Sequence, residues 1–413
     1  MRILYLAHRI PYPPNKGDKI RSYHHVRYLA GRHDVHLVAF VDAPEDERGA
    51  DALRSYCRDV TLVPLEKRAA LRRGLRALMR GRALSEGYFT SPAMQHAIAC
   101  AAATGRFDVV WAFSSPMMQY AAAVGAAWTV ADFVDVDSEK WRQFGAHARG
   151  PVRWAYQLEA TRLRAFERQS GAQADCVLFV SDAEATLYRT FCLDQTDVRV
   201  IPNGVDLTYF AAGDGAGPQA GGHLLFTGAM DYRPNIEAVV ACARKIVPLI
   251  RKQIPTVQLV AVGHRPAPRL LREAARHDGA LRIAGSVPDI RPYFRDARVY
   301  VAPLRLGRGV QNKILEAMAM CVPVVASTLA LQGLDVEPER HVLVADGDEQ
   351  FAAAVVKLWR DPARARSLAD TARRLVETRY GWAGNLERLD ACLPVAAGSA
   401  SAVDKPCAAC VAS

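Results

Sequence analysis

Apolar residues gather in short runs along the chain, and amphipathic stretches separate one run from the next. Short apolar runs are typical of strands buried on both faces of a parallel sheet, and the stretches between them have helical spacing. In the first half of the chain the runs are residues 3–7, 35–41, 107–113, 128–134, 176–180 and 198–201. This pattern predicts an α/β domain over residues 1–203.

A glycine-rich stretch at 213–222, GDGAGPQAGG, has the composition of a linker. A second series of apolar runs follows it at 224–227, 257–262, 281–284, 299–303, 322–326 and 342–344. We therefore expect a second α/β domain at 204–375, because the chain is too long for one ordinary core. Residues 376–393 are expected to form a final helix and residues 394–413 a disordered tail.

The stretch 305–327, RLGRGVQNKILEAMAMCVPVVAS, joins two apolar runs through a glycine loop and a helix. Gly307 and Gly309 allow the loop to pass close to a ligand. Backbone N–H groups and the helix dipole favour an anion at the start of the helix, where Lys313 adds a full charge. Glu316 follows one turn later on the same side. The pattern predicts a site for phosphate beside vicinal hydroxyls, although such turns also occur for packing alone.

Polar residues also follow strands of the first predicted domain. The loop HRIPYPPNKGDKIR lies at the carboxyl end of the first run, where open α/β sheets bind ligands, but it lacks the G-x-G-x-x-G dinucleotide motif. Asp135 and Asp137 follow the run at 128–134. This pair can hold a divalent metal or begin a helix capped by Ser138. We favour side chains that face a ligand, with no metal bound.

Composition narrows the choice of partners. The formal net charge of +10, from 53 basic against 43 acidic residues, favours nucleotides, nucleic acid or acidic lipid. Nine scattered cysteines are typical of reduced thiols in a cytoplasmic protein. Cys407 and Cys410 lie in the predicted tail without a second pair to hold a metal. Neither a signal peptide nor a membrane span is expected from the apolar pattern.

Residues 66–82, EKRAALRRGLRALMRGR, combine seven basic residues with leucines at helical spacing, namely Leu71, Leu75 and Leu78. A basic amphipathic helix of this kind can lie on anionic lipid. The alternative is a solvated helix whose leucines pack on the core of its own domain. We expect membrane contact, because the charge density exceeds what solubility requires.

Five short motifs occur in order along the chain. They are Val180-Ser-Asp-Ala-Glu184, Ile201-Pro-Asn-Gly-Val-Asp206, Phe226-Thr-Gly228, Gly285-Ser-Val-Pro-Asp289 and Lys313-Ile-Leu-Glu-Ala-Met318. Together they resemble the retaining nucleotide-sugar glycosyltransferases of family 4 over nearly the whole chain. The segments DKIRSYHHVRYLA, FVDVDSEKW and GVQNKILEAMA look like bacterial sugar transferases associated with exopolysaccharide and PEP-CTERM/exosortase loci. The resemblance implies the α/β GT-B fold, with two Rossmann-like domains facing across a cleft and a C-terminal helix packing back on the first domain.

The resemblance also implies where the donor binds. The backbone of Val287 would meet the base, Glu316 the ribose hydroxyls, and Lys313 with the loop amides the pyrophosphate, without a required metal or other cofactor. The expected donor-binding residues are Gly228, Arg233, Asn235, Val287, Gly307, Arg308, Gly309, Val310 and Glu316.

Three positions depart from the family pattern. Arg308 stands where the family commonly carries a Glu, and Ala229 and Pro234 stand where it carries Arg and Lys. Arg233 and Lys313 are the expected substitutes. The base and the sugar of the donor are therefore left open.

On the first domain, the resemblance implies an acceptor site and part of the catalytic machinery. The residues expected to bind the acceptor are Gly17, Asp18 and Arg21. Those expected to act in catalysis are Lys313, Asp135 and Asp137. Retention in the family is usually attributed to attack from the front face rather than to a protein nucleophile.

The implied function is transfer of a hexosyl group from a nucleoside diphosphate sugar to a glycan or lipid-linked glycan in exopolysaccharide biosynthesis, at the inner face of the membrane. A nucleotide-sugar epimerase of GT-B fold would share the donor site but lack acceptor and lipid contacts. A nucleic-acid-binding protein would explain the charge, yet basic residues interleaved with aromatic ones are confined to residues 23–28. We therefore expect no nucleic-acid partner.

Overall fold

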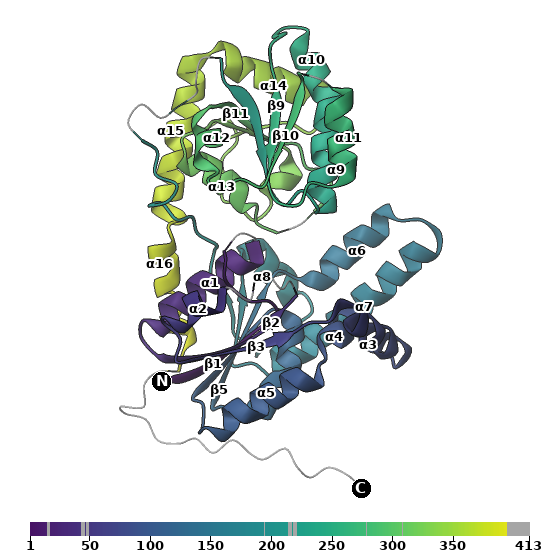
Figure 1. Cartoon of the computed structure of the whole chain (residues 1–413), viewed down its shortest axis with the longest axis vertical. Helices are drawn as coiled ribbons and strands as arrows, with labels where there is room; N and C mark the ends of the chain where they lie inside the picture. The colour runs from purple at the N-terminus through teal and green to yellow at the C-terminus, as the bar shows by residue number, and fades with distance from the viewer. Residues whose placement is uncertain are drawn as a thin grey trace.

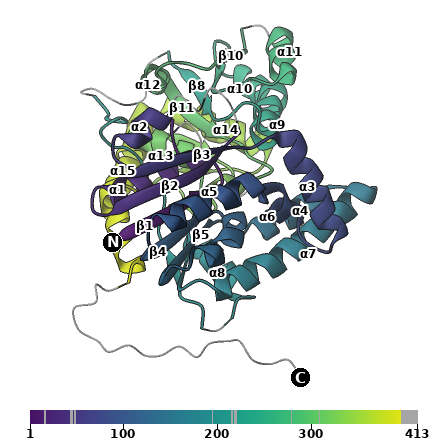
Figure 2. The same ribbon diagram turned by 60° about the horizontal axis from the view of Figure 1, so that its bottom comes forward.

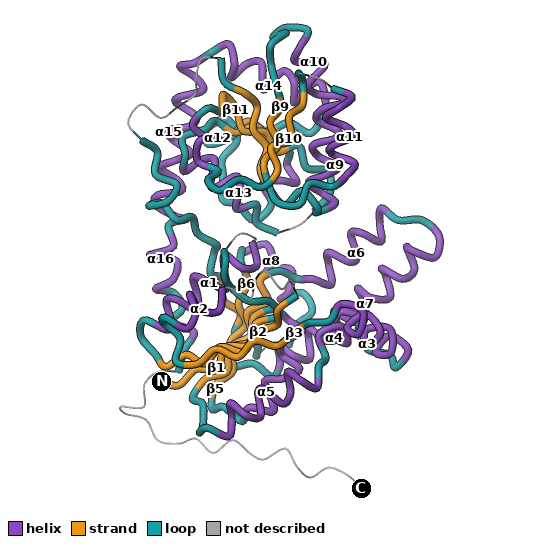
Figure 3. Tube along the Cα trace, in the orientation of Figure 1, coloured by secondary structure: helices purple, strands orange, loops and turns teal. Residues whose placement is uncertain are grey.

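The computed structural model describes residues 1–14, 17–42, 46, 49–193, 195–213, 217, 221–277, 279–307 and 309–394. The chain forms two α/β domains, the first below in purple to teal and the second above in green (Figure 1). Each domain is built around one parallel sheet, drawn in orange in Figure 3, with helices packed around it. This arrangement confirms the predicted fold class.

The first sheet has seven strands in the order β3-β2-β1-β4-β5-β6-β7. They are β1 (Arg2–Ala7), β2 (Asp34–Val41), β3 (Asp59–Pro64), β4 (Val109–Phe113), β5 (Trp128–Val134), β6 (Cys176–Phe179) and β7 (Val198–Val200). All six predicted runs form strands. The apolar pattern does not reveal β3, because this edge strand buries only Val60 and Val63 fully. A strand with one neighbour does not need a continuous apolar run.

The helices of the first domain are α1 (Gly17–Ala30), α2 (Ala50–Arg54), α3 (Lys67–Met79), α4 (Leu84–Phe89), α5 (Pro92–Ala103), α6 (Asp137–His147), α7 (Gly150–Ala172) and α8 (Asp182–Arg189), with a 3-10 segment, η2 (Ser115–Val124). Helices α6 and α7 form a long hairpin that extends to the right in Figure 1. Helix α3 packs on α4, and α4 packs on α7, so these helices form one side of the domain (Figure 2).

The second sheet has six strands in the order β10-β9-β8-β11-β12-β13. They are β8 (His223–Thr227), β9 (Leu259–Val262), β10 (Leu281–Gly285), β11 (Ala297–Ala302), β12 (Val324–Ala326) and β13 (Leu343–Val344), each at a predicted run. The helical segments are α9 (Arg233–Ala241), η3 (Cys242–Ile246), α10 (Val247–Arg251), α11 (Pro268–Arg276), α12 (Arg291–Arg295), α13 (Asn312–Ala319), η4 (Thr328–Leu331), α14 (Asp348–Arg360) and α15 (Pro362–Arg379).

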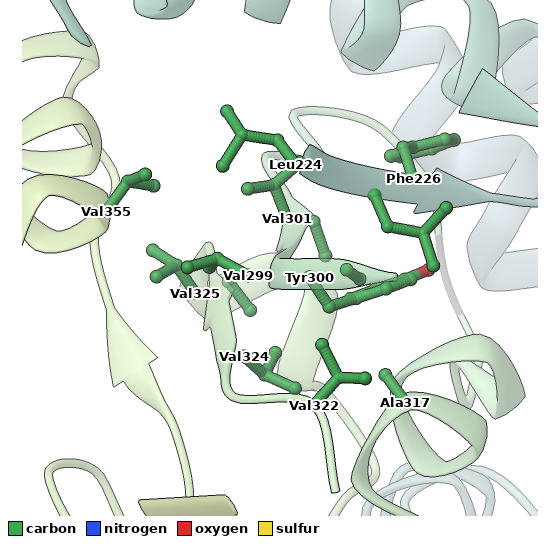
Figure 4. Close-up of a cluster of buried hydrophobic side chains, with 14 of the residues drawn as sticks. Leu224, Phe226, Val299, Tyr300, Val301, Ala317, Val322, Val324, Val325 and Val355 are labelled. Atoms are coloured by element: carbon green, nitrogen blue, oxygen red, sulfur yellow. The ribbon is translucent and has the colours of Figure 1, made fainter. Parts of the chain in front are cut away.

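The core of the second domain fixes the helix that the glycine loop opens. Val299, Tyr300 and Val301 of β11 lie at its centre, and Ala317 of α13 packs against this strand from one side (Figure 4). The hydroxyl of Tyr300 lies 3.1 Å from Oγ1 of Thr227, so this buried polar pair is satisfied. Helix α13 therefore packs directly on the core of the second domain.

The C-terminal segment returns to the first domain. Helix α15 is continuous to Arg379, beyond the expected domain limit at 375, and the chain crosses back at Tyr380 and Gly381 before α16 (Trp382–Glu387) and the 3-10 turn η5 (Asp390–Cys392). The first-domain core includes the buried residues Trp382, Leu386, Leu389, Cys392 and Leu393. The last helix, α16, therefore packs as part of the core of the first domain.

The predicted tail lies outside the described residues beyond position 394, and so do Cys407 and Cys410. The described cysteines are all free thiols: Cys57, Cys100, Cys176, Cys192, Cys242, Cys321 and Cys392. Within the described part of the chain, every helix is too short or too polar to cross a bilayer.

Candidate active site

The glycine loop between β11 and α13 touches the first domain. Gly307 and Gly309 have φ angles of +117° and +84°, which favour glycine. A Cβ atom at Gly309 would lie 2.8 Å from Oδ2 of Asp135, a residue of the first domain. Arg308 lies outside the described residues. The loop of one domain and a carboxylate of the other thus meet at a point where only glycine fits.

Lys313 and two of the expected donor-binding residues, Gly228 and Asn235, come together behind this loop. Nζ of Lys313 donates to Oδ1 of Asn235 at 2.7 Å, and Nδ2 of Asn235 donates to the backbone oxygen of Ala229 at 2.9 Å. Gly228 has a φ of +147°, and a Cβ there would lie 2.7 Å from Nδ2 of Asn235. The end of β8, the start of α9 and the start of α13 therefore form one cluster.

Burial sets the charge state of this cluster. It lowers the pKa of Lys313 to about 7, an effect that the charge of Glu316 opposes. Burial also raises the pKa of Glu316 to about 7, opposed by Lys313. The ammonium lies 4.6 Å from the ring centre of Phe226, which supplies an apolar wall. A bound diphosphate would favour the charged ammonium, so the cluster suits an anion.

The other expected donor-binding residues lie around the cluster. Val287 is half-buried in the turn after β10, and Val310 is half-buried against the second-domain core. Arg233 is mostly exposed, and its Nε donates to Oε1 of Glu237 at 2.7 Å, one turn along α9. The role of Arg233 as a substitute cation stays a prediction.

On the first domain, Asp135 follows β5 at a distorted strand end. Val134 has a φ of +69°, rare for a β-branched residue. Oδ1 of Asp135 is buried and has no hydrogen-bond partner among the described residues. Burial, with the charges of Glu184 and Asp137, raises the pKa of Asp135 to about 7. Such a carboxylate can accept a hydrogen bond from a hydroxyl group that enters the site.

Asp137 is the first residue of α6, and its Oδ1 lies 3.8 Å from Nζ of Lys140. The charge of Asp137 raises the pKa of Lys140, and Tyr232 of the second domain contributes as well. Ser138 does not cap the helix, because its hydroxyl donates to Glu167 at 2.5 Å. Among the described residues, no group of three His, Cys, Asp or Glu side chains has metal-binding geometry.

Lys140 is a candidate site residue that the sequence interpretation did not include. It supplies a cation from the first domain, near the residues of both domains that raise its pKa. The signal was present in the spacing Asp137-x-x-Lys140, which places the two side chains on one face of a helix that starts at a strand end.

The expected acceptor residues have different environments. Gly17 is exposed at the start of α1. Asp18 accepts a hydrogen bond from Nη1 of Arg9 and lies 3.5 Å from Nε2 of His8. Burial raises the pKa of Asp18, but the hydrogen bond with His8 and the charge of Arg9 outweigh it and hold the pKa below its usual range. Asp18 is therefore charged, and its carboxylate already accepts hydrogen bonds from Arg9 and from the backbone N–H of Lys19.

The prediction that Arg21 contacts the acceptor is wrong. Its side chain is 0% exposed, and its guanidinium donates to Asp132, Asn203 and the backbone oxygen of Ile201. A buried arginine with these partners cannot reach a ligand without breaking an internal ion pair.

Two Rossmann-like domains that meet through a glycine loop, with the last helix returned to the first, have the GT-B architecture. HepE from Anabaena, solved with UDP-glucose, aligns with a TM-score of 0.69 at 13% identity, over 95% of this chain and 99% of that chain. Sucrose-phosphate synthase from Thermosynechococcus elongatus aligns with a TM-score of 0.69 at 20% identity, over 95% and 98%. At these identities the likeness shows the fold alone.

Sequence comparison matches a family model to each of the two domains. The model described as Glycosyltransferase Family 4 matches residues 20–209, and the model described as Glycosyl transferases group 1 matches residues 221–361. The first domain is therefore similar to family 4 glycosyltransferases and the second to group 1 glycosyl transferases, and together the two matches support a glycosyltransferase of GT-B fold. The phosphatidyl-myo-inositol mannosyltransferase of Mycobacterium tuberculosis is 33% identical over 220 residues, which are 50% of this chain and 57% of that protein. The chain thus spans about half the length of the curated relatives it matches.

Proposed function

We propose that the protein transfers a hexosyl group, with retention, from a nucleoside diphosphate sugar to a hydroxyl group of a glycan or lipid-linked glycan. The observation that carries this proposal is the cluster of Lys313, Asn235 and the glycine loop, with Asp135 of the first domain opposite. A cation at a helix start suits a diphosphate, and a carboxylate opposite suits a hydroxyl. The structure of HepE with UDP-glucose supports this class of donor.

In the proposed reaction, the bond between the anomeric carbon and the diphosphate oxygen breaks, and a bond to the acceptor oxygen forms on the same face of the sugar. The acceptor proton passes to the leaving phosphate oxygen. Lys313 and the loop amides stabilise the charge that develops on the diphosphate, while Glu316 holds the ribose. Asp135 and Asp18 orient the acceptor hydroxyl. Lys140 adds a cation beside the leaving group.

A lipid-linked acceptor is favoured by two observations. The mannosyltransferase relative acts on phosphatidyl-myo-inositol, as its name states. In addition, Leu71, Leu75 and Met79 of α3 are 50%, 47% and 80% exposed among arginines. A surface of exposed apolar and basic side chains fits an anionic bilayer, so we place the enzyme at the inner membrane face, in exopolysaccharide biosynthesis.

The donor site is tested by replacing Glu316. Titration calorimetry of wild type with UDP, GDP and ADP should identify one preferred nucleotide. Glu316→Ala should raise the dissociation constant for that nucleotide roughly tenfold to a hundredfold, because one or two charge-assisted hydrogen bonds to ribose are lost. Glu349, exposed at the start of α14, gives a matched control, and Glu349→Ala should bind as wild type does.

Unchanged affinity in Glu316→Ala would remove this residue from the site. Product analysis with the preferred nucleotide sugar then separates the reaction classes. Transfer requires an added acceptor, whereas an epimerase would convert the donor without one. Conversion of the donor alone would overturn the proposal.

A further inference from the structure

A buried polar network lies where the chain leaves the first domain, after β7. Arg21 of α1 is at its centre. Nε and Nη2 of Arg21 donate to Asp132 at 3.0–3.2 Å. Nη1 donates to the backbone oxygen of Ile201 at 2.7 Å and to Oδ1 of Asn203 at 3.2 Å. The first domain thus fixes the side chain of Asn203 through a buried ion pair.

Asn203 also reaches the second domain. Its Nδ2 donates to Oδ1 of Asn312 at 3.1 Å, and Asn312 is the first residue of α13. The backbone oxygen of Asn203 accepts a hydrogen bond at 3.3 Å from Nδ2 of Asn385, which lies in α16. The outgoing and returning segments of the chain therefore meet at Asn203, next to the helix that carries Lys313.

This network specifies one position of α13 relative to the first domain. Arg21, Asn203 and Asn385 are 0%, 6% and 3% exposed, so a hydrogen bond lost here is not simply replaced by one to water. The amide orientation is also set, because Arg21 requires the oxygen of Asn203 and leaves its Nδ2 for Asn312. A shift of α13 away from the first domain would break the contact to Asn312.

We infer that Asn203 and Asn312 are positioning residues for the transfer step, and that Arg21 with Asp132 holds Asn203 in place. The inference rests on the proposed function. Lys313, Asn235 and Glu316 all belong to the second domain, so nucleotide binding does not need the contact between Asn203 and Asn312. Transfer does need it, because the donor on α13 must be aligned with Asp135 of the first domain.

The test is a double-mutant cycle of Asn203→Ala and Asn312→Ala, with nucleotide affinity and turnover measured for each variant. Asn312→Ala should lower kcat roughly three- to tenfold, the effect of one neutral hydrogen bond, and leave the nucleotide dissociation constant within about twofold. Asn203→Ala should lower kcat at least as much, and its melting temperature should fall because Arg21 loses an acceptor. The double variant should turn over no more slowly than Asn203→Ala alone.

Three results would overturn the inference: an unchanged kcat in Asn312→Ala, additive effects in the double variant, or a loss of nucleotide affinity as large as the loss of kcat. The last result would make Asn312 a donor-binding residue. If wild type binds nucleotide but transfers no sugar, the proposed function fails separately. X-ray scattering then still decides the inference, because Asn312→Ala without nucleotide should have a larger radius of gyration than wild type, and equal radii would contradict it.

Discussion

At the scale of single residues, Asp135 is placed by a strained backbone. The pairing of β5 with β6 shifts register between Asp132 and Val134, and Val134 adopts a positive φ. A left-handed β-branched residue costs on the order of 1–3 kcal/mol, which the surrounding sheet must offset. The distortion places Asp135 against Gly309 of the second domain. Strain of this kind is typical of functional sites, and it supports Asp135 as part of the site.

The raised pKa of Asp135 gives a pH-dependent prediction. Its folded-state pKa of about 7 exceeds the ordinary value, because burial and the charges of Glu184 and Asp137 disfavour ionisation. The folded protein therefore binds this proton more tightly than the unfolded chain does, and stability falls as the pH rises from about 4 to about 7. Asp135→Asn should be more stable than wild type at pH 8, on the order of 4 kcal/mol, and nearly equal to it at pH 4.

Thermal unfolding at the two pH values measures this difference. Asp51 is 88% exposed in its side chain, so Asp51→Asn should leave stability unchanged at both values. Asp135→Asn should also lose most of its transfer activity, because the neutral amide has one acceptor oxygen and lacks the negative charge that strengthens the hydrogen bond from a hydroxyl group. Equal stability of wild type and Asp135→Asn at pH 8 would show that the ionised carboxylate of Asp135 does not destabilise the folded protein.

The role of a residue could be predicted from the sequence only where its neighbours along the chain determine its surroundings. The glycine loop and helix start predict an anion site at Lys313 from local sequence alone, and the structure adds its contact with Asn235. Arg21 is different, because an arginine on an amphipathic helix has the same pattern whether it faces a ligand or a buried partner. Its partner Asp132 is 111 positions away, and only tertiary packing brings the two together.

At the scale of elements, α3 shows how small residues decide which face of a helix is buried. Its buried residues are Ala70, Gly74 and Ala77, and a Cβ at Gly74 would lie 3.0 Å from the backbone oxygen of Leu84. The close approach of α3 and α4 uses these small residues and leaves Leu71 and Leu75 outside. The leucine spacing predicts the helix, but it does not predict that the leucines face away from the core.

The exposed face of α3 is tested by charge reversal. Arg68, Arg72, Arg76 and Arg80 are all exposed, whereas Arg73 is half-buried and is left unchanged. Each basic residue near an anionic surface contributes about 1 kcal/mol, so replacing these four by Glu should cost roughly 4 kcal/mol of membrane partition. High salt should have the same effect on wild type. Co-sedimentation with liposomes, with and without acidic lipid, measures the difference.

A matched control reverses four exposed arginines of the second domain, namely Arg269, Arg272, Arg360 and Arg374. This control should still sediment with acidic liposomes, and both variants should bind nucleotide as wild type does. Equal sedimentation of wild type and the α3 variant would leave α3 as a solvated helix.

At the scale of the whole molecule, the two sheets follow from the apolar runs except for the edge strand β3, because strands buried on both faces need continuous apolar sequence. The contact between domains does not follow from such runs. It includes pairs of polar and glycine residues, Asn203 with Asn312 and Asp135 with Gly309, whose pairing no local pattern encodes. The fold is therefore more predictable from sequence than the half of the site that lies between the domains.

Whether transfer requires a divalent metal depends on how the residues of the site are divided between the two domains. A divalent cation would have to bridge the carboxylates of Asp135 and Asp137 in the first domain to a diphosphate on α13 of the second. Asp137 is instead paired with Lys140. In the proposed function, Lys313 with the loop amides supplies positive charge at the diphosphate. Transfer activity should therefore persist, within about twofold, when EDTA is added to a working assay, because fixed charges already stabilise the leaving group.

An assay of Lys140→Met and Lys313→Met in the same buffers provides the comparison, and each variant should lose activity with or without Mg²⁺. A complete loss with EDTA that Mn²⁺ or Mg²⁺ restores would instead assign Asp135 and Asp137 as metal ligands.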